Sequence, residues 1–258
     1  MNVIDLSKPI QFNKGDPSFM QVKIKHKPYW LARWLVRVLG LPFKLMPKDF
    51  VGWGDDLITQ MGVHSTTHID APSHYGPKSG DKEALSVEKI PLNECIGPGV
   101  VINMTHKKEG DVITVADMKE DLKKSGAKIE KGSIVLIYTG RDQYMGTKEF
   151  WKKGTGMGAD ATAWLIDQGV SVMGIDQWGW DVPFHFQIKQ AKKENRRDLF
   201  WEGHRIGQTK PYWQMEQLTN LQSLPSHGFK VCVFPLKIVG ASAAPARVVA
   251  LQEDLSCC

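Results

Sequence analysis

The segment HSTTHIDAPSH, residues 64–74, holds three of the eight histidines of this 258-residue chain, with an aspartate between the second and the third. Imidazole and carboxylate groups are the usual protein ligands of divalent metals such as zinc and manganese. This density of ligand atoms predicts a metal site, and a metal with an open coordination position activates water. The segment therefore points first to a hydrolase.

A straight strand cannot bring His64 and His68 to one metal. Both share parity with Asp70, so a strand would place the three side chains on one face. At about 3.3 Å per residue, however, the two histidines would lie roughly 13 Å apart. The chain must therefore bend around residues 65–67, whereas the second histidine and the aspartate can converge with little distortion. Pro72 stiffens the exit from the segment and favours an extended residue before it.

The composition is that of a globular protein, with 42% hydrophobic residues, 24% charged residues and a formal net charge of +5. The densest basic run, residues 189–197, is interrupted by Glu194 and lacks interleaved aromatic residues, which argues against a nucleic-acid partner. The four cysteines form no C-x-x-C pair, so neither a zinc finger nor a disulfide framework is expected. The first residues lack the basic and apolar regions of a secretory signal, and we expect a cytoplasmic location.

Residues 29–46 carry an amphipathic pattern, with Trp30 and Trp34 on its apolar face and Arg33 and Arg37 opposite. The segment is too short and too charged to span a bilayer. A helix lying on a membrane surface would show the same pattern. Because any surface helix has an apolar stripe, we favour a helix that packs on its own domain, on a partner subunit or over a pocket as a lid. We expect no stable membrane insertion.

Short apolar runs alternate with helical patterns along the rest of the chain. Strands are predicted at residues 100–104, 134–138, 170–176, 230–235 and 247–251. Helices are predicted at residues 115–125, with Thr114 as N-cap, and at residues 160–168, with Asp160 as N-cap. Strands separated by helices predict a mixed α/β domain.

The histidine segment resembles the H-x-G-T-H-x-D-x-P-x-H signature of the cyclase-like metal-dependent hydrolases. That family includes bacterial kynurenine formamidase, isatin hydrolase and a trans-dienelactone hydrolase. Residues 5–9 are similar to the N-terminal opening of the family, and residues 172–176 to its central strand. His204 and Glu216, twelve positions apart, are similar to its later metal-site pair.

The resemblance covers most of the chain and is weakest at a helical insert, about 29–46, and a charged insert, about 187–200. It implies one domain over residues 1–258. That domain would be a mixed β-sheet with flanking helices, of the swivelling β/β/α type.

The resemblance also implies a role for each candidate site residue. The first metal ion would be held by His64, His68 and Asp70, with Glu216 reaching it from the far end of the chain and His204 serving a second ion. His74 would be the general acid and base.

The segment around Glu216 agrees with a buried role for this residue. Residues 211–224 read as a helix with proline in its first turn, and Glu216 falls at the edge of the apolar face. An unpaired charge is costly there, so a metal partner would explain it. An exposed surface glutamate remains the alternative.

One position departs from the family signature, because Thr66 stands where the signature has glycine. A positive φ would strain a β-branched residue.

We therefore predict a metal-dependent hydrolase with one or two Zn²⁺ or Mn²⁺ ions. It would cleave a formamide, lactam or lactone bond in a small cyclic or aromatic molecule, as an arylformamidase, an isatin hydrolase or a dienelactone hydrolase. His74 would move the proton, because imidazole titrates near neutrality. The alternative is a non-catalytic metal- or ligand-binding protein of the same fold, although a pure binding site has no need of His74. We also expect a homodimer or homotetramer.

Overall fold

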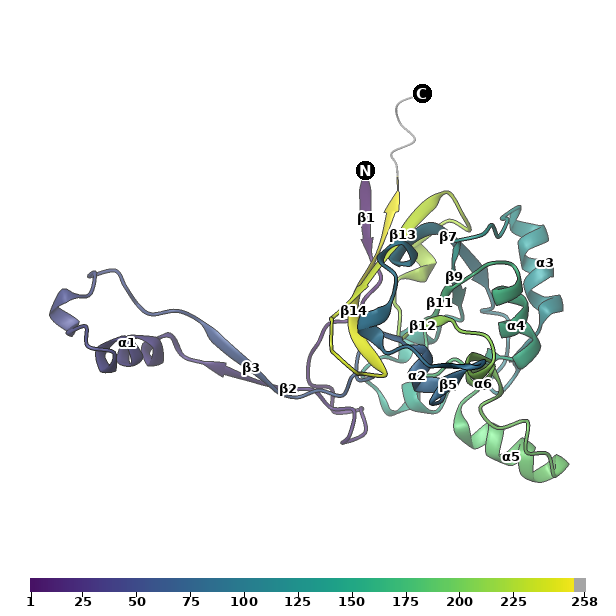
Figure 1. Ribbon diagram of the computed structural model, residues 1–258, viewed down its shortest axis with the longest axis horizontal. Helices are drawn as coiled ribbons and strands as arrows, with labels where there is room; N and C mark the ends of the chain where they lie inside the picture. Colours follow the sequence, from purple (N-terminus) through teal and green to yellow (C-terminus); the bar gives the residue numbers. More distant parts are fainter. Residues whose placement is uncertain (253–258) are drawn as a thin grey trace.

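A sheet that closes on itself forms the centre of the computed structural model, which describes residues 1–252 (Figure 1). Its strands, in chain order, are β1 (Asn2–Asp5), β4 (His68–Asp70), β7 (Ile96–Asn103), β9 (Ile134–Tyr138), β11 (Val172–Ile175), β12 (Trp213–Glu216), β13 (Phe229–Pro235) and β14 (Ala243–Gln252). The spatial order is β1-β14-β13-β7-β9-β11-β12-β4, and β4 also pairs with β14. Seven strands therefore form a barrel-like ring, with β1 attached outside it.

Two apolar cores lie on the two faces of this sheet. Strands β7, β9, β11 and β12 run parallel, and the other pairs are antiparallel. Parallel strands buried on both faces are apolar throughout, as in the run IVLIY of β9. Ile134 and Leu136 of this strand pack into the core inside the ring, whereas Val135 and Ile137 pack outward with residues of the covering helices.

The covering helices are α3 (Val115–Ser125) and α4 (Ala159–Asp167). Helix α3 confirms the prediction, since Thr114 forms a capping box with Asp117 at its N-terminus. Helix α4 begins one residue before the predicted start. Its N-cap is Gly158, so the prediction of Asp160 as the cap is wrong. The five predicted strands correspond to β7, β9, β11, β13 and β14.

Residues 211–224 do not form the helix that their apolar spacing predicts. They contain strand β12, followed by a 3-10 turn, η7 (Leu221–Ser223). In β12, Trp213 and Met215 face the core inside the ring and alternate with two buried polar residues. The strand pairs with β11 on one side and with β4 on the other, and this pairing overrides the helical pattern.

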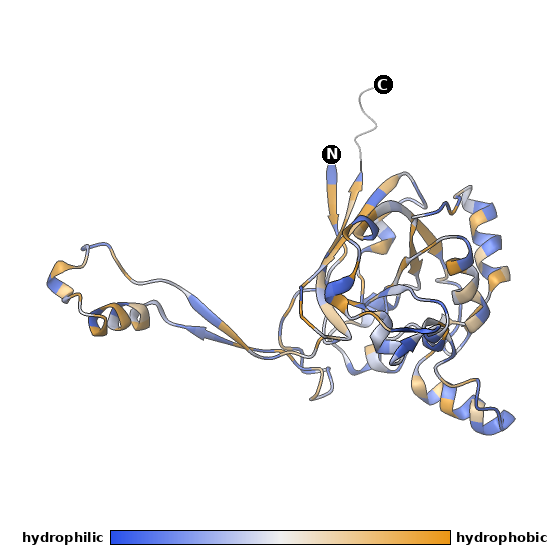
Figure 2. Cartoon of the chain, in the orientation of Figure 1, coloured by the Kyte–Doolittle hydropathy of each residue, from blue (hydrophilic) through white to orange (hydrophobic). Residues whose placement is uncertain are grey.

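The predicted 29–46 helix lies at the tip of an arm that projects from the ring (Figures 1 and 2). The arm is the antiparallel hairpin of β2 (Lys23–Lys27) and β3 (Asp55–Gln60), which carries α1 (Tyr29–Val38) and η1 (Phe43–Leu45). The helix ends before Pro42, as expected near a residue that disfavours helix before it. The expectation that this helix packs on its own domain or over its own pocket is therefore wrong.

Shorter elements complete the fold. They are α2 (Pro72–Tyr75), β5 (Lys78–Ser79), β6 (Lys82–Glu83), η2 (Val87–Lys89), η3 (Leu92–Cys95), β8 (Val112–Ile113), η4 (Arg141–Tyr144), η5 (Lys148–Trp151), β10 (Gly156–Met157), α5 (Phe184–Glu194), α6 (Glu202–Arg205) and η6 (Ile206–Gln208). Within residues 1–252, no helix is long and apolar enough to cross a bilayer.

Asp176, directly after β11, holds the ends of two neighbouring strands together. Its buried carboxylate accepts hydrogen bonds from the backbone and the hydroxyl of Thr139 and from the backbone of Gly140, at 2.6–2.8 Å. Asp176→Ala should lower the free energy of unfolding by about 3 kcal/mol, because buried donors would lose their acceptor. Urea denaturation measures this loss.

Asp121→Ala is the control for this prediction, since within residues 1–252 Asp121 accepts a single, exposed backbone hydrogen bond, from Asn103. It should cost less than about 1 kcal/mol. Equal losses in the two variants would contradict the proposed structural role of Asp176.

Candidate metal centre and pocket

Strands β4 and β12 bring two of the predicted ligands together with a third. His68 and Asp70 are two residues apart on β4, so they project from one face of the strand. The antiparallel register sets Glu216 opposite His68 and Gln214 opposite Asp70. All four side chains are buried. Four polar groups from two strands therefore meet on one face of the sheet.

His64 reaches this group through the predicted bend, because the chain turns over residues 63–67. Its Nδ1 lies 3.1 Å from Nε2 of His68 and 2.9 Å from Oδ1 of Asp70. Nε2 of His68 lies 3.3 Å from the same oxygen. This spacing suits ligands around one ion, whose bonds would be about 2.1 Å long.

The chemistry of these atoms fits a bound cation. Oδ1 of Asp70 is buried and accepts no hydrogen bond from any residue that the structure describes. Nδ1 of His68 donates to the Thr66 carbonyl at 2.7 Å, which directs Nε2 toward the aspartate. A buried carboxylate is costly unless it is paired. A divalent ion among His64, His68 and Asp70 would supply the missing partner.

Burial and the neighbouring charges also shift the pKa values of Asp70 and His68. Burial alone would raise the pKa of Asp70, but His74, His68 and His64 hold it well below its usual value. Burial alone would lower the pKa of His68, but Asp70 and then Glu216 raise it. Without a metal, the raised pKa of His68 favours a proton on this ring, which partly balances the buried carboxylates.

Glu216 is better satisfied than Asp70. Its Oε1 accepts from Gln214 Nε2 at 2.7 Å, and its Oε2 accepts from the backbone of Gly179 at 2.9 Å. Among the described residues, two groups place their donor atoms within 4.8 Å of one another: His68 with Asp70 and Glu216, and His64 with Asp70 and His74. His204 belongs to neither group.

His74 lies on the short helix α2, beside the other histidines. Its ring centroid is 4.3 Å from that of His64 and 5.7 Å from that of His204. Burial lowers the pKa of His74 to about 4, so the ring is neutral near pH 7. The position suits both a proton acceptor and a metal ligand.

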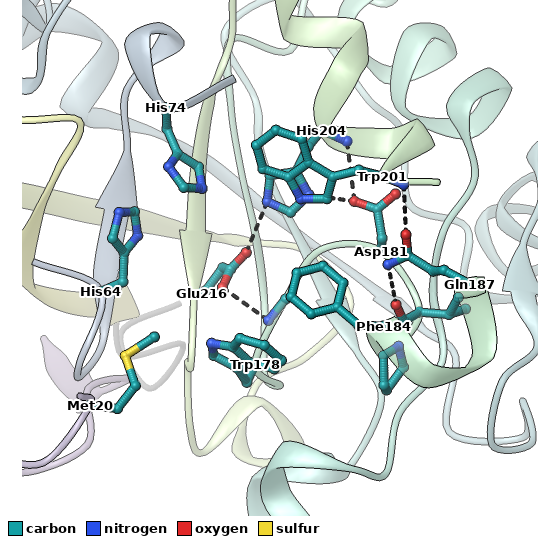
Figure 3. Close-up of a pocket in the computed structure, with 13 residues that line it drawn as sticks. Met20, His64, His74, Trp178, Asp181, Phe184, Gln187, Trp201, His204 and Glu216 are labelled. Atoms are coloured by element: carbon teal, nitrogen blue, oxygen red, sulfur yellow. Dashed lines mark hydrogen bonds and ion pairs between the residues drawn. The ribbon is translucent and has the colours of Figure 1, made fainter. Parts of the chain in front are cut away.

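His204, on α6, is oriented by Asp181, a role that the sequence pattern did not predict. Asp181 accepts from Nδ1 of His204 and from the backbone of Gly203 and His204 (Figure 3). Trp201 stacks on the histidine ring with a centroid distance of 4.7 Å. Trp201 has a φ of 57°, a strained value for a non-glycine residue of the kind found near functional sites.

The loop that carries His64 is fixed by Gln217, another role that the sequence pattern did not predict. Its Nε2 donates to the His64 carbonyl at 2.7 Å, and its own carbonyl accepts from Thr67 Oγ1 at 2.6 Å. Gln217 also has a positive φ, 58°. Thr66 is not among the positive-φ residues, so a β-branched residue fits where the family signature has glycine.

The candidate metal centre opens into a cavity of about 170 Å³ (Figure 3). The other walls are aromatic, formed by Trp178, Phe184 and Trp201. A largely apolar cavity with a few convergent polar groups is typical of small-molecule sites. The full lining is Met20, His64, His74, Trp178, Gly179, Asp181, Val182, Pro183, Phe184, Gln187, Trp201, His204 and Glu216.

Comparison with known proteins identifies the family. A sequence model of the Cyclase family matches residues 4–182, and the chain belongs to this family. The chain is similar to isatin hydrolase of Roseibium aggregatum, with 24% identity over 204 residues that cover 74% of this chain and 72% of that protein. It is similar to kynurenine formamidase of Paracidovorax citrulli, with 25% identity over 189 residues that cover 73% and 76%.

The fold agrees with this assignment. Isatin hydrolase A from Ralstonia solanacearum superposes with a TM-score of 0.71 and 25% identity, over 98% of this chain and 92% of that chain. The mixed α/β expectation is thus confirmed, whereas the swivelling β/β/α description stays a prediction. Nothing among these relatives favours the dienelactone hydrolase type.

The Asp181–His204 pair predicts a pH-dependent stability. In the chain without metal, burial alone would lower the pKa of His204, but Asp181 and then Glu216 raise it from 6.5 to about 10. A raised pKa stabilises the folded state fully below pH 6.5, and this contribution is lost as the pH rises through about 10. Asp181→Asn should remove most of it, so the stability difference from wild type should shrink between pH 6 and pH 10.

Urea denaturation of the metal-free proteins at several pH values measures this difference. His204→Gln is the control, since its stability should lack the same pH-dependent contribution. A difference between Asp181→Asn and wild type that stays constant with pH would refute the pairing.

Proposed function

We propose that this protein is a metal-dependent hydrolase that cleaves a C–N or C–O bond in a small aromatic molecule. The observation that carries the proposal is the buried Oδ1 of Asp70, which lies 2.9 Å from His64 and 3.3 Å from His68 without a well-formed hydrogen bond, next to an aromatic pocket lined by His64. The names of two relatives, isatin hydrolase and kynurenine formamidase, support hydrolysis of an aromatic lactam or formamide.

Different residues of the chain would bind the metal, transfer the proton and position the substrate in this reaction. A divalent Zn²⁺ or Mn²⁺ ion held by His64, His68 and Asp70 would lower the pKa of water and polarise a carbonyl group. The neutral imidazole of His74 accepts the proton of the attacking water and returns it to the leaving group. Trp178 and Trp201 hold the aromatic ring of the substrate and exclude bulk water from the polar wall.

Metal analysis of purified protein, together with hydrolysis of isatin and N-formylkynurenine, tests the proposal. Asp70→Ala should lose both the metal and the activity, because it removes the carboxylate shared by the two histidines. His74→Ala should keep the metal and lose 100-fold or more in kcat, on the order of a general acid–base contribution. Asp121→Ala is the control and should match wild type.

Full activity in Asp70→Ala would refute the proposed mechanism. Loss of the metal in His74→Ala would show instead that His74 is a ligand. Wild-type protein without metal and without activity on either substrate would refute the proposed function.

We propose further that the chain works as a homodimer or homotetramer and that the arm is the contact surface. The apolar face of α1 is exposed, with Trp34 at 55%, Val38 at 79% and Leu39 at 76%. The turn between β13 and β14 exposes a second apolar group, including Leu236 and Val239. One chain cannot bring these two surfaces together because its arm projects away (Figure 2). A second, symmetry-related copy can cover both.

Replacing residues 28–54 with Asn-Gly would close the hairpin with a tight turn and remove the arm tip. Light scattering should show an oligomer for wild type and a smaller species for the variant, with unchanged metal content. A wild-type monomer that sediments with lipid vesicles, and a variant that does not, would instead assign the arm to a membrane surface.

A further inference from the structure

The side chain of Gln214 lies among three residues that would hold a second metal ion in a two-metal site. Its Nε2 is 2.7 Å from Oε1 of Glu216, 3.0 Å from Nε2 of His204 and 3.3 Å from Oδ2 of Asp70. We infer that this chain binds one ion, among His64, His68 and Asp70, and that the Gln214 amide occupies the position of a second. This inference rests on the proposed function.

The strand register fixes Gln214 in this place. Gln214 is opposite Asp70 across the β4–β12 ladder, and two residues from Glu216 on the same face of β12. The side chain is completely buried, so it has no solvent-exposed alternative position. The register therefore keeps the backbone of Gln214 opposite Asp70, so the side chain starts beside the two carboxylates.

Hydrogen bonding also fixes which end of the amide faces the carboxylates. The hydroxyl of Tyr212 donates to Oε1 of Gln214 at 2.9 Å. Tyr212 is itself buried and stacked on Tyr75, with ring centroids 4.7 Å apart. The carboxylates of Glu216 and Asp70 only accept hydrogen bonds, so the NH₂ group of Gln214 points at them, in agreement with the Tyr212 contact. An amide NH₂ donates hydrogen bonds and has no lone pair for a metal.

The spacing of the surrounding groups agrees with this assignment. Within the part of the chain that the structure describes, the two groups with donor atoms inside 4.8 Å of one another both include Asp70, and neither includes His204. His204 is 3.4 Å from Glu216, but the amide nitrogen lies between it and Asp70. The amide thus separates His204 from Asp70, two of the three residues that would form a second site.

The two oxygens of Asp70 consequently have different partners. Oδ2 accepts from the Gln214 amide, whereas Oδ1 makes no well-formed hydrogen bond and lies 2.9 Å from His64 and 3.3 Å from His68. Both oxygens of Glu216 have hydrogen-bond donors without any metal. A single ion at Oδ1 therefore satisfies the group, and a second ion would have to displace the amide.

Gln214→Glu is the sharpest test, because it keeps the shape of the side chain and the Tyr212 contact while replacing the donor NH₂ with an oxygen ligand. Metal content would be measured by mass spectrometry after equilibration with Zn²⁺ or Mn²⁺ and removal of free ion. Wild type should hold one ion per chain and Gln214→Glu two. Added metal should also raise the Tm of the variant more than that of wild type.

Gln187→Ala serves as the control. Its side chain lines the same pocket and bonds the backbone of Trp201, away from the carboxylates, so it should hold one ion. Gln214→Ala, which removes the amide altogether, should also gain the second ion and provides an independent variant if the added carboxylate prevents folding.

The outcomes separate this inference from the proposed function. Two ions in wild type would overturn the inference and leave the hydrolase proposal standing. One ion in wild type and in both Gln214 variants would overturn the role assigned to the amide. A wild-type chain that binds no ion would refute the proposed metal site and the inference with it.

Discussion

The antiparallel pairing of β4 with β12 is the constraint on which the rest of the structure depends. Strand β4 has only three residues, yet it pairs with β12 on one side and with β14 on the other. It thereby closes the ring. Its middle residue, Ile69, is part of the core inside the ring, so His68 and Asp70 must face the opposite way. The packing of one isoleucine therefore orients two candidate metal ligands.

This arrangement buries charges that the fold must then balance. Asp70 and Glu216 are both buried within one cluster, and burial of a carboxylate is costly without a partner. Gln214, the Gly179 backbone and the histidines provide most of the hydrogen bonds. Among the described residues, Oδ1 of Asp70 is the carboxylate oxygen of the cluster without a well-formed hydrogen bond, although His64 and His68 lie within 3.3 Å of it. The fold thus leaves Oδ1 of Asp70 available to bind a cation.

The rest of the chain supplies the pocket wall, the loop that carries His64, and the projecting arm. The segment after β11 and helices α5 and α6 supply the aromatic wall of the pocket, Asp181 and His204. The loop between β3 and β4 supplies His64 and is held by Gln217. The arm lies outside both cores, and its apolar side chains are exposed in the isolated chain. The candidate catalytic groups therefore lie on elements held by hydrogen bonds and packing, whereas the arm exposes apolar side chains.

The sequence by itself determined the local features whose causes are local. The apolar run of residues 134–138, the capped helix after Thr114 and the bend between His64 and His68 all followed from short-range chemistry. Family resemblance then named the candidate ligands. Periodicity failed at residues 211–224, because apolar residues three apart suggested a helix where Trp213 and Met215 alternate as a strand.

Only the tertiary structure decided the position of Gln214, Asp181 and the arm. Gln214 meets Asp70 because strands 144 residues apart pair in one register. Asp181 orients His204 across 23 residues of chain. The arm helix has the stripe of an ordinary surface helix, and nothing in that stripe shows that it projects from the body. Long-range pairing and packing determine these features, and a local sequence pattern does not specify which distant residues will lie beside it.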